Sequence, residues 1–257
     1  MLRSRTLVAS LLTATTLAAC SDGTSPNAER PVSLSFTTGT SSAAGVPLVR
    51  LSGTVPRLDL VAGTGEDAIT ITKAQVVLRQ VRLERSAAIT CSDDAVEESD
   101  DCAEIELGPV LVDLPLTADV TPTLDGLVPA GTYARMKLQL HKPSDHVRDA
   151  AFLAAHPEFE DVSVRVEGTY RGEPFVFTSS VTDVMHLGFN PPLLVEGTTT
   201  NVTVGIDVAS WFAGTAGATL SPTDPANASA IASRIQASFR AFGDGDRDGH
   251  EDDGSDD

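Results

Sequence analysis

The sequence predicts an all-β protein, an antiparallel β-sandwich with a short C-terminal helix. Short runs in which apolar and polar residues alternate recur along most of the chain, and this period of two is typical of half-buried strands. Turn-forming residues separate the runs without a recurring helix between them, which disfavours a parallel sheet built from strand–helix units. The 257 residues, 41% of them hydrophobic, are enough for a sizeable core.

The charge balance limits the partners that we expect. The chain has 18 Lys and Arg against 36 Asp and Glu, a formal net charge of −18. A field of this sign repels phosphate groups, so it disfavours nucleic acid and anionic lipid surfaces as partners.

The first nineteen residues predict an export signal. Arg3 and Arg5 precede an apolar stretch, residues 7–17, which is too short to span a bilayer as a helix. It ends in Leu17-Ala18-Ala19-Cys20, and this order resembles the lipobox of bacterial lipoproteins. The resemblance covers the leader alone. It implies that residues 1–19 are a signal peptide and that Cys20 becomes the acylated N-terminus. An ordinary cleavable signal with a coincidental Cys is the alternative.

The residues after the expected cleavage site form a polar tether, residues 20–30, whose Gly and Pro content favours a flexible chain. Acyl chains on Cys20 would hold the following domain on a membrane, so the resemblance implies a lipid-anchored protein of the bacterial cell envelope. Ser21 follows the Cys, whereas Asp at this position favours inner-membrane retention in proteobacterial lipoproteins. The resemblance therefore favours the outer membrane or the cell surface.

The sandwich domain is expected over residues 31–240. Its strands are expected in eight alternating runs, at 32–36, 69–72, 74–83, 134–140, 162–166, 174–178, 184–189 and 202–208. After Leu78 the apolar positions change from even to odd numbers, which predicts a β-bulge. Arg171-Gly172-Glu173 predicts a hairpin turn. Further turns are expected at Asp125-Gly126 and at Asn190-Pro191-Pro192.

Two helices are expected beside the strands. Residues 146–156 are Ala-rich and end before Pro157, which predicts a short surface helix. Asp224-Pro225 supplies an N-cap and a first-turn proline for a second helix, whose apolar face would dock on the sandwich. That face consists of Ala228, Ile231, Ile235 and Phe239. A last strand from Ile235 to Phe242 is the alternative for the same segment.

The remaining cysteines are expected to form a disulfide. With Cys20 acylated, Cys91 and Cys102 are left as a pair in an oxidising compartment. The ten residues between them include six acids, whose repulsion the bridge would restrain, and the bridge would contribute about 2–3 kcal/mol. The loop is interpreted as a solvated hairpin tip, with a cation-binding or partner-facing finger as the alternative.

The end of the chain, residues 241–257, is expected to be an acidic tail. Asp244, Asp246 and Asp248 precede Gly249, and Asp252 follows. This order resembles the first half of an EF-hand-like calcium loop, also found in dockerin and thrombospondin type 3 modules. The resemblance implies that the four Asp residues are calcium ligands, because carboxylates at such positions converge on a hard cation.

The match to a calcium loop is incomplete. Its twelfth position is Ser255 instead of a bidentate Glu, so the expected affinity is weak, about 10⁻⁴–10⁻³ M or worse. A plain solvated tail without bound calcium is the competing interpretation.

The sequence supplies no catalytic motif, and we expect a protein that is not an enzyme. Serine-hydrolase, zinc-protease, phosphate-loop and dinucleotide-binding patterns are all missing from the chain. His141, His146 and His156 lack the i, i+4 spacing of a helical zinc pair, so they are interpreted as surface or loop residues. His186 is expected to face solvent or a sheet edge.

Two functions remain for such a chain. The first is a non-enzymatic binding or structural module of the envelope that responds to calcium through its tail. The alternative is a surface carbohydrate- or ligand-binding module that uses sandwich loops near Trp211, although Trp211 is expected to close the end of the core. In overall pattern alone, the body resembles uncharacterised β-sandwich domains of bacterial envelope lipoproteins.

Overall fold

The computed structural model describes residues 28–38, 60–85, 102–117, 120–197 and 199–252. The expected signal peptide, Cys20, residues 21–27 of the tether, and Cys91 lie outside these residues. Cys102 begins a strand, but its side chain is also outside the description. The acylation of Cys20 and the Cys91–Cys102 disulfide therefore stay predictions. Among the described residues, no helix is both long enough and apolar enough to cross a membrane.

The first of two sheets contains four strands. Their spatial order is β11 (Phe239–Gly243), β10 (Thr200–Ile206), β1 (Glu29–Thr37) and β5 (Thr121–Pro129). The N-terminal strand β1 runs parallel to β10, and the other pairs of this sheet are antiparallel.

The second sheet contains seven strands and is antiparallel throughout. Five of them follow in the order β8 (Glu173–Ser179), β7 (Val164–Tyr170), β3 (Ile69–Glu84), β6 (Gly131–Leu140) and β9 (Asp183–Val195). Two more strands, β2 (Leu60–Ala62) and β4 (Cys102–Asp113), also pair with the long strand β3.

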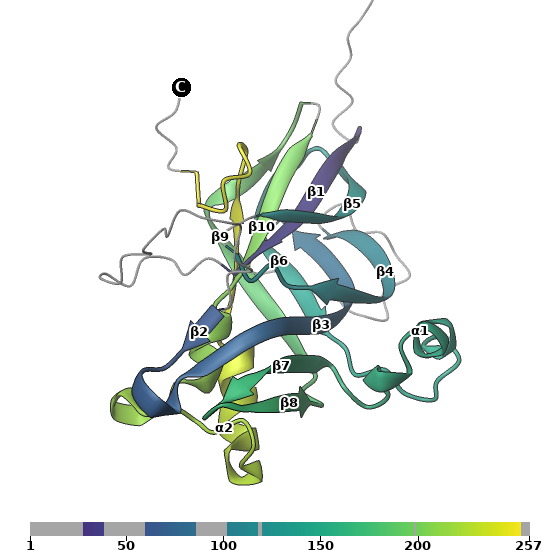
Figure 1. Ribbon diagram of the computed structural model, residues 1–257. Coiled ribbons are helices and arrows are strands. Elements are labelled where there is room, and N and C mark those ends of the chain that lie inside the picture. The colour runs from purple at the N-terminus through teal and green to yellow at the C-terminus, as the bar shows by residue number, and fades with distance from the viewer. Residues whose placement is uncertain (1–27, 39–59, 86–101, 118–119, 198, 253–257) are drawn as a thin grey trace, which may run out of the picture.

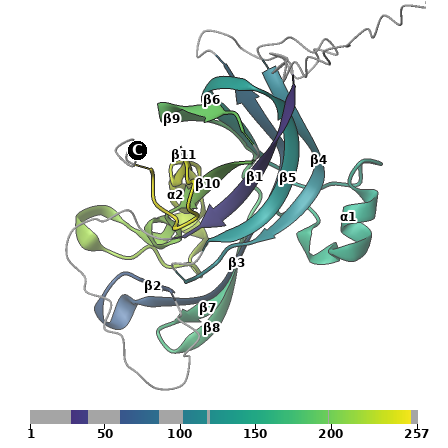
Figure 2. The ribbon, with the colours of Figure 1, turned by 90° about the horizontal axis from the view of Figure 1, so that it is seen from above.

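The two sheets pack against each other (Figures 1 and 2), and buried residues from both form one core. β4 lies beside β5 and β9 lies beside β11, so the sheets approach each other along both edges. The core contains alternate residues of each strand, such as Leu34 and Phe36 of β1 and Val202 and Val204 of β10. The prediction of an all-β sandwich is confirmed.

Two local predictions are confirmed as well. The pairing of β3 shifts between Leu78 and Gln80 against both β4 and β6, where the change of parity predicted a bulge. Arg171 and Gly172, with φ of 51° and 82°, connect β7 to β8. Positive φ at both central residues is typical of a two-residue type I′ hairpin turn.

Two of the expected turns are wrong. Asp125-Gly126 lies inside β5, paired with Ser33 and Val32 of β1, because the ladder with β1 outweighs the turn preference of these two residues. Asn190-Pro191-Pro192 lies inside β9. The ladder between β9 and β6 is interrupted at this point, so the prolines remove no hydrogen bond from it.

The helices are shorter than expected. α1 (Ala150–Ala155) lies outside the sandwich, and its Phe152 packs with Phe159 against Val77 of β3. α2 (Ala228–Gln236) follows Asp224, whose carboxylate accepts a hydrogen bond from Ala226 N, and it buries two isoleucines.

The helix α2 ends at Gln236 and does not extend to Phe239. From Phe239 the chain forms strand β11, which pairs with β10. The expected helix is therefore correct for the first part of this segment, and the alternative strand is correct for the second part. The strand continues to Gly243, past the expected domain end at 240, because β10 offers an edge that would otherwise lack backbone partners.

Trp211 is fully buried in the 3-10 helix Val208–Phe212 and closes the end of the core, as expected. Its Nε1 donates to Ser238 Oγ at 2.8 Å, and this hydroxyl donates to Ile235 O at 2.7 Å. One serine therefore links Trp211 to the end of α2.

We expect Ser238→Ala to lower the free energy of unfolding by about 1–3 kcal/mol, because it leaves the buried Trp211 Nε1 without an acceptor. Chemical denaturation measures this change. Ser233→Ala is the matched control, since Ser233 is exposed on α2 and bonds only within the helix. Equal stability of the two variants would contradict the role given to Ser238.

Candidate functional site

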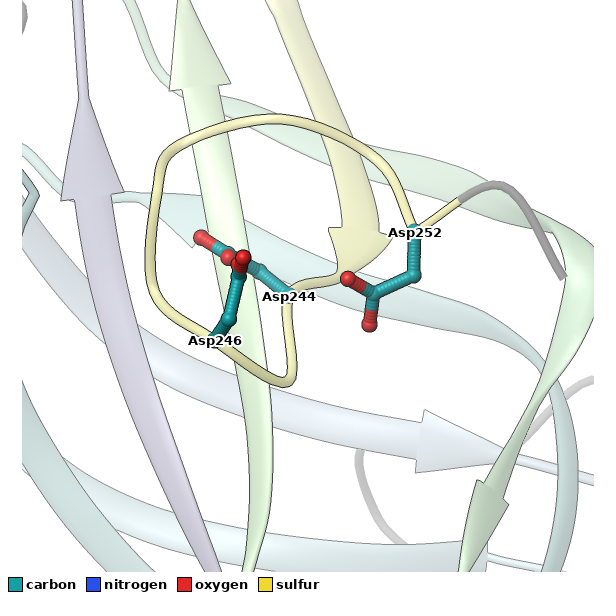
Figure 3. Close-up of side chains that lie close together, drawn as sticks. All are labelled: Asp244, Asp246 and Asp252. Atoms are coloured by element: carbon teal, nitrogen blue, oxygen red, sulfur yellow. The ribbon is translucent and has the colours of Figure 1, made fainter. Parts of the chain in front are cut away.

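The acidic segment after β11 folds back on the strand as a closed loop, residues 244–252, which we call the acidic loop (Figure 3). At its start, Asp244 N donates to Asn201 O of β10 at 3.2 Å. At its end, Asp252 N donates to Gly243 O at 3.3 Å. These backbone bonds bring the two ends of the loop together.

The carboxylate of Asp244 is the centre of this loop. It is fully buried, and its Oδ2 accepts hydrogen bonds from Thr203 Oγ1 at 2.7 Å and from Gly249 N at 3.1 Å. Its Oδ1 accepts a third from Asp248 N at 3.0 Å. Asp244 thus ties the far side of the loop to β10.

Three of the four predicted calcium ligands come together. Asp244, Asp246 and Asp252 each offer an oxygen, and these oxygens lie within 4.8 Å of one another (Figure 3). Asp248 is not part of this group, and its Oδ1 accepts a hydrogen bond from His250 N at 2.7 Å. The arrangement therefore departs from the predicted set at one position.

Gly249 occupies a position where a side chain would not fit. Its φ of 84° is in the left-handed region that favours glycine. A Cβ here would lie 3.0 Å from Val120 Cγ2 and 3.3 Å from Thr37 Oγ1. The glycine lets the acidic loop pass close to the end of β1.

The basic residue of the loop does not neutralise the carboxylates. Arg247 directs its guanidinium at Asn201 Oδ1, with hydrogen bonds of 3.0 and 2.7 Å, and Asn201 Nδ2 donates to Gly245 O at 3.0 Å. Among the described residues, no ion pair involves Asp244, Asp246 or Asp252. Their mutual repulsion therefore favours a bound cation.

A pocket of about 370 Å³ lies beside the loop. The apolar segment 191–194 of β9 lines it, and so do Asp244 and Asp252. The other residues that line it are Glu196, Thr199, Thr200, Asn201, Gly243, Gly245 and Glu251. All the charged residues that line it are acidic.

Sequence reasoning did not find this pocket or the role of Asn201 and Thr203. Both residues lie on β10, more than forty positions before the loop that they bind. Their alternation with Val202 and Val204 predicted which face of the strand they occupy, but no sequence pattern connected that face with the acidic segment.

The predicted positions of the histidines are partly wrong. His146 and His186 are exposed as expected, but His141 is buried, with Nε2 2.9 Å from Asp149 Oδ1. It is buried because the carboxylate of Asp149, itself buried, satisfies its ring nitrogen. In the part of the chain that the structure describes, no metal-like cluster forms around these histidines.

The sequence matches no protein-family model and no curated protein. Among solved structures, MbnP from Methylosinus trichosporium is similar to this chain with a TM-score of 0.35 and 13% sequence identity. The match covers 84% of this chain and 99% of that protein. A likeness at this level carries no conclusion about function.

The buried carboxylate of Asp149 makes stability depend on pH. Burial raises the pKa of Asp149, but hydrogen bonds from Ser144 N and His141 lower it more, so that the pKa lies below the ordinary value of 3.8. A lowered folded-state pKa stabilises the protein above the unfolded-state pKa, and this contribution is lost as the pH falls through the folded-state value.

We therefore expect Asp149→Asn to flatten the dependence of the unfolding free energy on pH below about pH 4. At neutral pH the free energy of unfolding of the variant should be lower by about 1–3 kcal/mol, because a hydrogen bond to a charged group contributes about this much. Denaturant titrations at a series of pH values measure both effects. Asp145→Asn, at an exposed position in the same segment, is the control, and the same pH profile in both variants would refute this account.

Proposed function

We propose that this chain is a lipid-anchored protein of the bacterial cell envelope that binds calcium weakly through its acidic loop. It acts as a binding or structural module and not as an enzyme. The observation that carries the proposal is the convergence of Asp244, Asp246 and Asp252 in the acidic loop.

The chemistry of the three ligands supports calcium. Ca²⁺ takes six to eight oxygen ligands and accepts irregular geometry, and three carboxylates with nearby carbonyls and water can supply such a set. A divalent ion would offset two of the three negative charges. Calcium modules outside the cell work at Kd values of about 10⁻⁴–10⁻³ M, which suits a site with so few protein carboxylates.

The rigid attachment of the loop also favours binding. Thr203 and Asn201 hold the loop on β10 through side-chain hydrogen bonds, so less chain entropy is lost when an ion binds. The hydrogen bonds to Asp244 from Asp248 N and Gly249 N preserve the turn around the ligands.

The lipid anchor is supported by the lipobox order at Leu17–Cys20. β1 begins at Glu29, and residues 21–28 can extend over roughly 30 Å at most. An acylated Cys20 would therefore keep the sandwich close to the membrane surface. The net charge of −18 supports a protein without a nucleic-acid partner.

The alternative is a surface module that binds a carbohydrate or another ligand. Stacking on Trp211 does not support it, because this side chain is fully buried and its Nε1 is occupied by Ser238. The observation in its favour is the pocket between β9 and the acidic loop.

Calorimetric titration of calcium into the chain should give saturable heat with a Kd of about 10⁻⁴–10⁻³ M. Asp246→Asn should weaken binding about tenfold or more, because it removes one of three carboxylates at the site. Asp248→Asn is the matched control, and it should change the Kd by no more than about threefold, since Asp248 lies outside the group.

Each result has a distinct meaning for the site. If both variants lose the same calcium affinity, Asp248 is a ligand as well. That result would support the full Asp-x-Asp-x-Asp set and contradict a site made of the three converging carboxylates alone. Heat of dilution alone in the unsubstituted chain would refute calcium binding.

Changing Cys20 to Ala should move the protein from the membrane fraction to the soluble fraction, because the acyl chains supply the membrane affinity. Fractionation of cells that produce either form, followed by immunodetection, measures the change. Membrane association that is unchanged in the Ala variant would refute the anchor.

A further inference from the structure

We propose that the pocket between β9 and the acidic loop binds a neutral polyol, such as a sugar, whose vicinal hydroxyl groups complete the coordination of the calcium ion. This inference rests on the proposed calcium site and names the ligand that the site would take.

The first support is the position of the pocket relative to the carboxylates. Asp244 and Asp252 belong both to the converging group and to the residues that line the pocket. An ion held by these carboxylates therefore lies at the border of the pocket. Three carboxylates leave part of the preferred six to eight oxygen positions unfilled, and hydroxyl oxygens of a pocket ligand can fill them in place of water.

The charge of the pocket selects a neutral ligand. Glu196 and Glu251 line it together with Asp244 and Asp252, and Asp246 adds a fifth carboxylate at the ion. A calcium ion offsets two of these five charges and leaves three, and the lining residues include no Lys or Arg. A carboxylate or phosphate ligand would be repelled, whereas hydroxyl groups can bind the ion and donate to Glu196.

The apolar wall of the pocket can contact the C–H face of a sugar ring. Pro191, Pro192 and Leu194 form this wall on β9, and Leu194 is 52% exposed. The C–H faces of a pyranose can pack on such a surface while its hydroxyl edge points to the ion. The 370 Å³ of space lies at the small end of the range for ligand pockets, about 300–1,000 Å³.

The test is a titration of methyl α-mannoside, a neutral pyranoside with vicinal hydroxyl groups, into the full-length chain in detergent. Two-dimensional NMR follows the amides of Asn201, Gly243 and Gly245, which line the pocket. At saturating calcium these signals should shift and saturate, and removal of calcium by a chelator should weaken the affinity about tenfold or more.

Two variants separate the wall from the ion site. Leu194→Ser should weaken sugar binding several-fold and leave the calorimetric Kd for calcium unchanged. Val176→Ser, which removes a similarly exposed apolar side chain from β8, should change neither affinity. Melting curves of both variants confirm that they fold.

The outcomes distinguish this inference from the function on which it rests. Calcium binding without a sugar response in these amides overturns the polyol pocket and leaves the calcium site. No calcium binding overturns both. Sugar binding that is independent of calcium overturns the bridged arrangement.

Discussion

The long strand β3 bulges after Leu78, where its pairing with both β4 and β6 shifts. β3 pairs with β2, β4, β6 and β7, so its register determines the faces of the whole second sheet. After the bulge, Val81 and Leu83 belong to the core, while Glu84 on the opposite face pairs with Arg135. Without the extra residue, charged side chains would enter the core, because a slip of one position exchanges the faces of a strand.

The candidate site depends on a second constraint, the pairing of β11 with β10. This pairing places the acidic loop beside Asn201 and Thr203, and the buried carboxylate of Asp244 then holds the loop through three hydrogen bonds. The site is thus attached to a central strand of a sheet instead of a free terminus. Its carboxylates are positioned by hydrogen bonds within the folded chain, and such preorganisation would favour the proposed ion site.

The same attachment connects the two proposals. β9 packs against β11 at the edge where the sheets meet, so the loop and the apolar segment 191–194 face a common space. An ion at the loop would change the charge of that space, and a ligand in it would meet both an apolar wall and open coordination positions. The irregular stretch of β9 at its two prolines is what supplies this wall.

The all-β class, the bulge after Leu78 and the hairpin at Arg171-Gly172 could be predicted from the sequence, because side-chain alternation and turn preference act between neighbours in the chain. It also indicated the carboxylates of the acidic loop. Three features could not be predicted in this way: β1 pairs in parallel with β10, Asp125-Gly126 continues a strand, and Asp248 lies apart from Asp244, Asp246 and Asp252. These outcomes depend on which strand edges the packed core leaves free and on hydrogen bonds between distant segments, and neither leaves a local pattern in the sequence.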